Sequence, residues 1–184
     1  LDSGQFNTMV GYAAGQASSG TITYTGNTGL GYQALYAITT GGYNTVIGYN
    51  AGNDGTTMSG STFVGTEAGE TVTTGNFNTA VGFHSMDGGV TTGGNNVAMG
   101  VYSLDAITSG DDNVAIGTNA GGSLTTANRN VLIGREAGFN IQGGDGANTA
   151  VGVFALDAIT TGTDCTGLGY GTDPSSATAI NQTM

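Results

Sequence analysis

The pentapeptide Asn78-Thr79-Ala80-Val81-Gly82 is one copy of a pattern that recurs along the whole chain. The pattern reads Asn, then Thr or Val, a variable residue, an aliphatic residue and Gly. Its copies are NTMVG at 7–11, NTGLG at 27–31, NTVIG at 44–48, STFVG at 61–65, NTAVG at 78–82, NVAMG at 96–100, NVAIG at 113–117, NVLIG at 130–134, NTAVG at 148–152 and CTGLG at 165–169. The closing glycines are 17 or 18 residues apart after a first interval of 20. Ten copies at one period identify a repeat protein.

The length of the unit predicts the fold class. Seventeen residues are too few for the helix pair of the common helical repeats, which takes about 34 residues, and Gly and Thr are poor helix formers. The sequence therefore predicts an all-β protein, a parallel β-solenoid (β-roll) of about ten 17-residue coils, each with two short strands and two turns. We place this rod at residues 1–172 and a C-terminal segment after the last coil at 173–184, with Pro174 marking the end of regular stacking.

The alternation of side chains along a strand predicts two faces. The second and fourth positions of the pentapeptide share one face and the third points to the other. We expect the fourth position, aliphatic in every copy (for example Val81 and Ile116), to be the main core row, and the third, often Ala or Gly, to be closely packed as well. The Asn column should form a hydrogen-bonded ladder, and the closing Gly should mark a bend with positive φ or a close backbone approach. Because such a coil has a thin core, we expect a parallel homotrimer.

Composition excludes several classes. The 184 residues include 36 Gly, one Pro and no Trp, and 38% are hydrophobic, which does not fit collagen or a disordered chain. Arg129 and Arg135 are the only basic residues and the net charge is −11, so we expect no nucleic-acid partner. No apolar run approaches the ~18–20 residues that cross a bilayer, so we expect no membrane insertion.

The chemistry-bearing residues give no catalytic constellation. His84, the only histidine, occupies a variable position of the repeat and is interpreted as a surface residue. Cys165 replaces the repeat Asn in the last copy and is interpreted as a buried structural thiol. One His and one Cys argue against a zinc site. We therefore predict no enzyme activity, no catalytic, cofactor-binding or metal-binding residues, and no cofactor.

The acidic residues invite a test for calcium. Asp87, Asp105 and Asp157 share one repeat position, while other acids lie in turns, namely Asp111, Asp112, Asp145 and Asp164. A loose match to a calcium-binding β-roll motif occurs once, at 143–146, rather than in tandem. Solvated turn acids that keep the chain soluble are the preferred interpretation.

Two further rows suggest binding surfaces. Aromatic residues follow the repeat glycine at Tyr12, Tyr32, Tyr49, Phe83 and Tyr170. They suit either sugar stacking or, as we prefer, a ladder that packs between coils or chains. Thr pairs recur at 39–40, 73–74, 91–92, 125–126 and 160–161. Adjacent residues point to opposite faces of a strand, so these pairs indicate a corner more than a flat ice-binding surface.

The units NTAVG, NVAIG and NVAMG resemble the head repeats of trimeric autotransporter adhesins, the YadA-like family. They are also similar to the 17-residue NTAIGYQALYSNTTG-type arrays of phage tail fibres and related bacterial surface proteins. The nearest copy is Gly31-Tyr32-Gln33-Ala34-Leu35-Tyr36 followed by Thr39-Thr40-Gly41, and the resemblance covers about residues 6–172.

This resemblance implies a left-handed parallel β-roll, trimeric, with its axis along a fibre. It also implies an extracellular location, on a surface appendage or a virion, and a role as a structural or adhesive segment that mediates attachment or acts as a rigid spacer. The implied partners are further copies of the chain and a host-surface glycan or protein receptor. The alternative function is a glycan- or ice-binding β-solenoid module.

Overall fold

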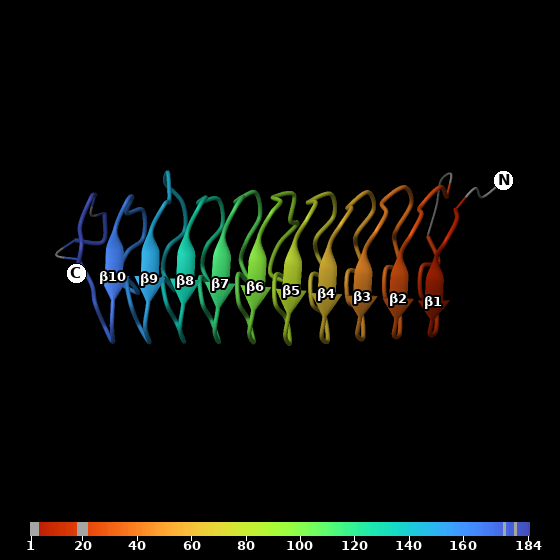
Figure 1. The fold of residues 1–184 in the computed structure, drawn as a ribbon, viewed down its shortest axis with the longest axis horizontal. Helices are drawn as coiled ribbons and strands as arrows, with labels where there is room; N and C mark the ends of the chain where they lie inside the picture. Colours follow the sequence, from red (N-terminus) through yellow and green to blue (C-terminus); the bar gives the residue numbers. More distant parts are fainter. Residues whose placement is uncertain (1–3, 18–21, 175, 179) are drawn as a thin grey trace.

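The computed structural model describes residues 4–17, 22–174, 176–178 and 180–184, and its regular structure consists of strands. The strands are β1 (Thr8–Val10), β2 (Thr28–Leu30), β3 (Thr45–Ile47), β4 (Thr62–Val64), β5 (Thr79–Val81), β6 (Val97–Met99), β7 (Val114–Ile116), β8 (Val131–Ile133), β9 (Thr149–Val151) and β10 (Thr166–Leu168). They form one parallel sheet in chain order, so the coils stack along the long axis of the molecule and the termini lie at opposite ends (Figure 1). The all-β parallel β-solenoid predicted from the repeat is confirmed.

Each coil contributes one strand to this sheet, at the second to fourth positions of the pentapeptide. The prediction of a second strand in each coil is wrong for the described residues. Turns and a few isolated bridges, such as Val72 with Thr91, stand in its place. The turns are rich in left-handed backbone, including non-glycine residues such as Glu67 and His84 with φ of 57° and 50°. Backbone bonds to neighbouring coils replace the bonds that a second strand would make.

The register pairs every strand position with the same position of the next unit. Ala80 aligns with Ala98, and Ala98 aligns with Ala115. The register also holds across the 18-residue units, for example where β8 pairs with β9, so the extra residue is accommodated outside the strands. Equivalent positions of the repeat therefore form columns parallel to the long axis of the molecule.

The glycine that closes each pentapeptide is required for two reasons, as Gly117 illustrates. Its φ is +134°, a conformation that residues with a side chain rarely adopt. A Cβ added there would lie 2.5 Å from the carbonyl oxygen of Gly134 in the next coil. The predicted bend and close approach are both confirmed.

The assignment of the two strand faces from sequence is wrong. The middle residue of each strand is the one that points into the coil, and it is buried from β2 to β10, as for Phe63 and Leu132. The fourth-position residues, expected to form the core, point outward; Ile116 remains 37% exposed and Leu168 58% exposed. The interior is filled by other rows of the repeat, the small residue three positions after the closing Gly and the aliphatic residue farther on, such as Ala120 and Leu124.

Large and small residues compensate for each other inside the coils. Phe63 lies against Gly69, where an added Cβ would be 2.7 Å from the ring, and Leu132 lies against Gly138. Other coils reverse the order, with Ala or Gly in the strand and Leu or Met four positions after the closing Gly; these pairs are Gly29 with Leu35, Ala80 with Met86, Ala98 with Leu104, and Ala150 with Leu156. Protein interiors are close-packed, so these coils hold one large side chain at one of the two positions. In the coil of β7 both positions are small, Ala115 and Gly121, and Leu104 and Leu132 of the neighbouring coils lie against Gly121.

The expected asparagine ladder is present and buried. Asn113 donates from Nδ2 to Oδ1 of Asn96 over 3.0 Å and to the carbonyl of Ala127 over 2.9 Å. Its own Oδ1 accepts bonds from the backbone N–H and the Nδ2 group of Asn130. Buried polar groups are stable only when hydrogen-bonded, so this column ties each coil to both neighbours.

Isolated backbone contacts with the last coil continue past Pro174, after the last regular strand, β10. Thr163 bridges to Ile180, and Thr166 bridges to Thr183. The backbone N–H of Met184 donates to the carbonyl of Thr166 over 2.8 Å. The last residues of the chain therefore cover part of the open edge of β10.

Candidate functional site

The outward face of the sheet is a regular surface that runs along all ten strands. It consists of two columns, the second and fourth positions of the ten pentapeptides. The second-position residues are Thr8, Thr28, Thr45, Thr62, Thr79, Val97, Val114, Val131, Thr149 and Thr166; the fourth-position residues are Val10, Leu30, Ile47, Val64, Val81, Met99, Ile116, Ile133, Val151 and Leu168. Each is exposed or half-buried, and none is charged. We call these twenty residues the outer sheet face.

The tyrosines that follow the closing glycines form a ladder at the N-terminal end. Tyr12 stacks on Tyr32 with ring centroids 5.2 Å apart, and Tyr32 stacks on Tyr49 at 5.1 Å. Tyr32 has a stacked ring on each of its faces, whereas Tyr12 and Tyr49 each stack on one ring. This arrangement matches the packing ladder preferred from sequence, and it is a poor platform for the face-on stacking by which aromatic rings hold sugars.

The threonine pairs form corners whose hydroxyl groups are used along the axis. Thr39 Oγ1 donates to the carbonyl of Thr56 over 3.0 Å, and Thr73 Oγ1 donates to the carbonyl of Thr91 over 3.3 Å. Thr125 Oγ1 continues the series to Gln142. A hydroxyl group that donates to the next coil cannot donate to the ordered water of an ice surface. These threonine hydroxyl groups therefore stabilise the stack of coils.

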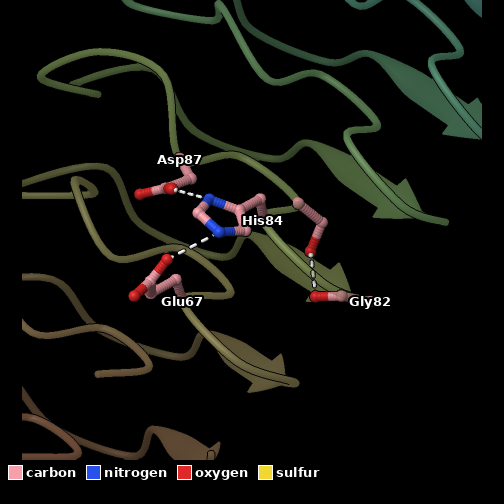
Figure 2. A network of polar contacts seen from close by, with 5 residues as sticks. Glu67, Gly82, His84 and Asp87 are labelled. Carbon is pink, nitrogen blue, oxygen red and sulfur yellow. Dashed lines mark hydrogen bonds and ion pairs between the residues drawn. The ribbon is translucent and has the colours of Figure 1, made fainter. Parts of the chain in front are cut away.

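His84 lies between two carboxylates instead of standing alone on the surface. Its Nε2 is 2.7 Å from Oε2 of Glu67, and its Nδ1 is 2.5 Å from Oδ2 of Asp87 (Figure 2). The three side chains are between 13% and 26% exposed. We call these residues the His84 cluster. An imidazolium donates from both nitrogens and satisfies both carboxylates.

The repeat explains why these groups meet. Glu67 and His84 each stand two positions after a closing Gly, and Glu70 and Asp87 each stand five positions after it. The axial backbone bond from His84 N–H to the carbonyl of Thr66 holds the two turns in register. Two neighbouring coils thus place Glu67, Glu70, His84 and Asp87 in two adjacent columns.

Further aromatic and acidic side chains surround the imidazole. The ring of Phe83 meets it edge-on at 4.1 Å between centroids, and Tyr102, in the next coil of the same column, lies at 5.4 Å. Asp105 extends the acidic column beyond Asp87. The imidazole is therefore held by an aromatic contact on its own coil and by residues of both neighbouring coils.

Burial is the main reason why carboxyl groups in and beside the His84 cluster have raised pKa values. Burial, and then the nearby charges of Asp87, Glu67 and Asp54, raise the pKa of Glu70 from 4.5 to about 7. Burial also raises the pKa of Asp87, against the lowering effect of its hydrogen bond to His84. The pKa of Asp105 is raised by burial as well. One imidazole does not neutralise this group of acids.

The remaining sequence candidates lie where they were expected. Asp111, Asp112, Asp145 and Asp164 are exposed turn residues. Cys165 is fully buried, and its backbone N–H donates to Oδ1 of Asn148, so the thiol residue continues the asparagine column. The loose motif at 143–146 lies in the turn region of an 18-residue unit.

Sequence reasoning missed the His84 cluster because it weighed the histidine and the cysteine for zinc and the acidic residues for calcium, each separately. Carboxylates are ligands too, and the 17-residue offset between Glu67 and His84, and between Glu70 and Asp87, was visible in the sequence. Aligning the units by their closing glycines gives the columns. The side-chain conformations that turn these groups towards one another needed the structure.

No helix in the described part of the chain is long and apolar enough to cross a membrane. Comparison of this chain with protein-family models, with curated proteins and with solved structures found no match.

Proposed function

We propose that this chain is a rod segment of a homotrimeric fibre on a virion or cell surface, where it serves attachment or holds an attachment domain at a distance. The observation that carries the proposal is the outer sheet face, where every coil exposes an uncharged aliphatic residue. The resemblance of the repeat to trimeric fibre arrays supports an assembly of three chains.

The energetics favour a partner for this face. Parallel sheets are normally covered on both sides, and large contiguous apolar surfaces mark interaction sites. The chain carries a net charge of −11, yet the outer sheet face carries none of it. Copies of the chain repel one another elsewhere, so this face is where they approach at least electrostatic cost.

A closed ring of three parallel copies covers the outer sheet face of all ten coils at once. A head-to-tail interface that closes after three rotations gives a finite assembly. Because the columns run straight along the axis, the same contact repeats in each coil. The solenoid then acts mechanically: backbone hydrogen bonds along the axis, such as Gly117 N–H to the carbonyl of Met99 at 2.8 Å, resist unfolding.

The test replaces an outer-face residue with a charge. Ile116→Asp places a carboxylate at the centre of the proposed interface and should convert the trimer to monomer at micromolar concentration, as measured by sedimentation equilibrium. Val90→Asp is the matched control, because Val90 is apolar and 65% exposed but lies in a turn outside the sheet. Circular dichroism checks that both variants keep the β-solenoid. An unchanged trimer in Ile116→Asp would overturn the proposed interface.

A second measurement separates attachment from spacing. The purified chain is tested for retention on host cells, on glycan arrays and on growing ice crystals. Retention on any of these assigns binding to the rod itself, whereas loss of all three leaves a spacer. Retention on ice alone would replace the fibre proposal with the ice-binding alternative.

A further inference from the structure

We propose that the His84 cluster is a binding site for a divalent transition-metal ion of the zinc type, which links the coil of β4 to the coil of β5. The ion binds Nε2 of His84 and the carboxylate of Glu67, where the structure holds these atoms 2.7 Å apart. Asp87 accepts the Nδ1–H bond of the same ring. Glu70 stands in the same turn as Glu67 and adds a further carboxyl group to the surroundings of the ion.

The geometry needs little adjustment to accept the ion. Zinc binds imidazole nitrogen and carboxylate oxygen at about 2.0–2.2 Å, so two of its ligand atoms lie roughly 3.3 Å apart in a tetrahedral shell. The nitrogen–oxygen pair therefore opens by well under 1 Å. One ligand atom from each of Glu67, His84 and Asp87 already lies within 4.8 Å of the others. The ion replaces the proton shared between Nε2 and Glu67, and that proton leaves to solvent.

The position of Asp87 is that of a supporting residue. Metal-binding histidines generally donate their other ring N–H to a carboxylate, which fixes the tautomer and directs the free nitrogen at the metal. Here the Asp87 carboxylate meets Nδ1, so Nε2 is the nitrogen that faces Glu67. The imidazole is pre-oriented by its contact with Phe83 as well.

The surrounding charge favours a cation over a proton. Glu70 and Asp105 share the repeat column of Asp87 and add two further carboxyl groups in the coils on either side of it. A divalent ion neutralises two of these charges, whereas a protonated histidine neutralises one. The imidazole ligand selects zinc, nickel or cobalt over calcium and magnesium, which prefer oxygen ligands alone.

The site is specific to one pair of coils. Glu136 occupies the same column as Glu67 and His84, but Phe154 follows it in the next coil, and Phe139 occupies the column of Glu70. That position therefore offers two carboxylates, Glu136 and Asp157, and no imidazole in the same backbone setting. It provides an internal control for binding by scattered surface acids.

The test is calorimetric titration of the full chain with zinc chloride, and separately with calcium chloride, in the wild type and in matched variants. Wild type should bind one zinc ion per chain at the specific site. His84→Gln and Glu67→Gln should abolish that binding event, and Asp87→Asn should weaken it about 10–100-fold. Glu136→Gln and Cys165→Ser should bind zinc as the wild type does.

A second readout holds even if a variant folds poorly. His84 is the only histidine, so its ring gives a single set of NMR signals in the wild-type chain. Stoichiometric zinc should shift these signals and raise the melting temperature, and calcium should do neither. Unshifted ring signals, or equal zinc binding in a folded His84→Gln variant, would overturn the proposal.

Discussion

The inner and outer faces of the same strands follow opposite rules. On the inner face, the middle residue varies from Gly29 to Phe63, and a residue later in the coil varies in the opposite sense. On the outer face, the fourth position is aliphatic in every copy although it is solvent-exposed in the single chain. The interior of a folded coil constrains the summed volume of its side chains and not the size of each one. The uniform outer row instead reflects a requirement that the single coil does not impose, which is what contact with further copies of the chain would supply.

The largest expected effect comes from emptying the inner face. Phe63→Ala removes a fully buried ring and should lower the free energy of unfolding by about 3–5 kcal/mol. Chemical denaturation at several chain concentrations measures it, and the loss should be the same at each concentration because the ring packs within one chain. A loss below about 1 kcal/mol would mean that the inner face is not the core.

The second effect tests compensation within the coil. Adding Gly69→Leu to Phe63→Ala gives the coil of β4 the Ala-plus-Leu arrangement seen at Ala98 and Leu104. Leu104 already adopts a φ of 48°, so the left-handed backbone accepts this residue. The double variant should recover about 2 kcal/mol relative to Phe63→Ala alone, read from a double-mutant cycle. Gly69→Leu alone should destabilise, because Phe63 fills the same space.

A smaller effect is expected on the outer face. Val64→Ala, next to Phe63 in the same strand, removes two methyl groups from the proposed interface and should weaken association by about 1 kcal/mol per chain. Because binding stabilises the folded state by mass action, the thermal midpoint should rise with chain concentration, and less so in the variant. A midpoint independent of concentration in both proteins would contradict the proposed difference between the faces.

The last effect is a pH dependence that belongs to neither face. The folded chain holds the pKa of Glu70 at about 7, against 4.5 for an ordinary glutamate. Between these values the folded state binds more protons than the unfolded state, so stability falls as the pH rises from about 4.5 to about 7. Glu70→Gln should flatten this fall in denaturant midpoints measured without divalent metal. An equally steep fall in the variant would assign the dependence to other acids.

Much of the fold could be predicted from the sequence because the repeat is so regular. The pentapeptide located all ten strands, and the Asn column and the closing glycines behaved as their chemistry requires. The two strand faces were exchanged because a uniform aliphatic row was equated with a core. The opposite size changes at Phe63 with Gly69, and at Ala98 with Leu104, are a sequence signal for the true interior.

The His84 cluster could be predicted only in part. Columns follow from the period, so the neighbourhood of Glu67, His84 and Asp87 could be obtained by aligning the units. The distances of 2.5 and 2.7 Å depend on side-chain rotation in left-handed turns, which periodicity does not specify. The raised pKa of Glu70 likewise depends on burial that only the packed coils define.

The most direct test of the account is the mass of the unmodified chain in solution. Sedimentation equilibrium at micromolar concentration and physiological salt should give three times the mass of one chain, with a β-rich circular dichroism spectrum. A stable, folded monomer under these conditions would show that the outer sheet face is not an interface between copies, and the fibre proposal would fall with it.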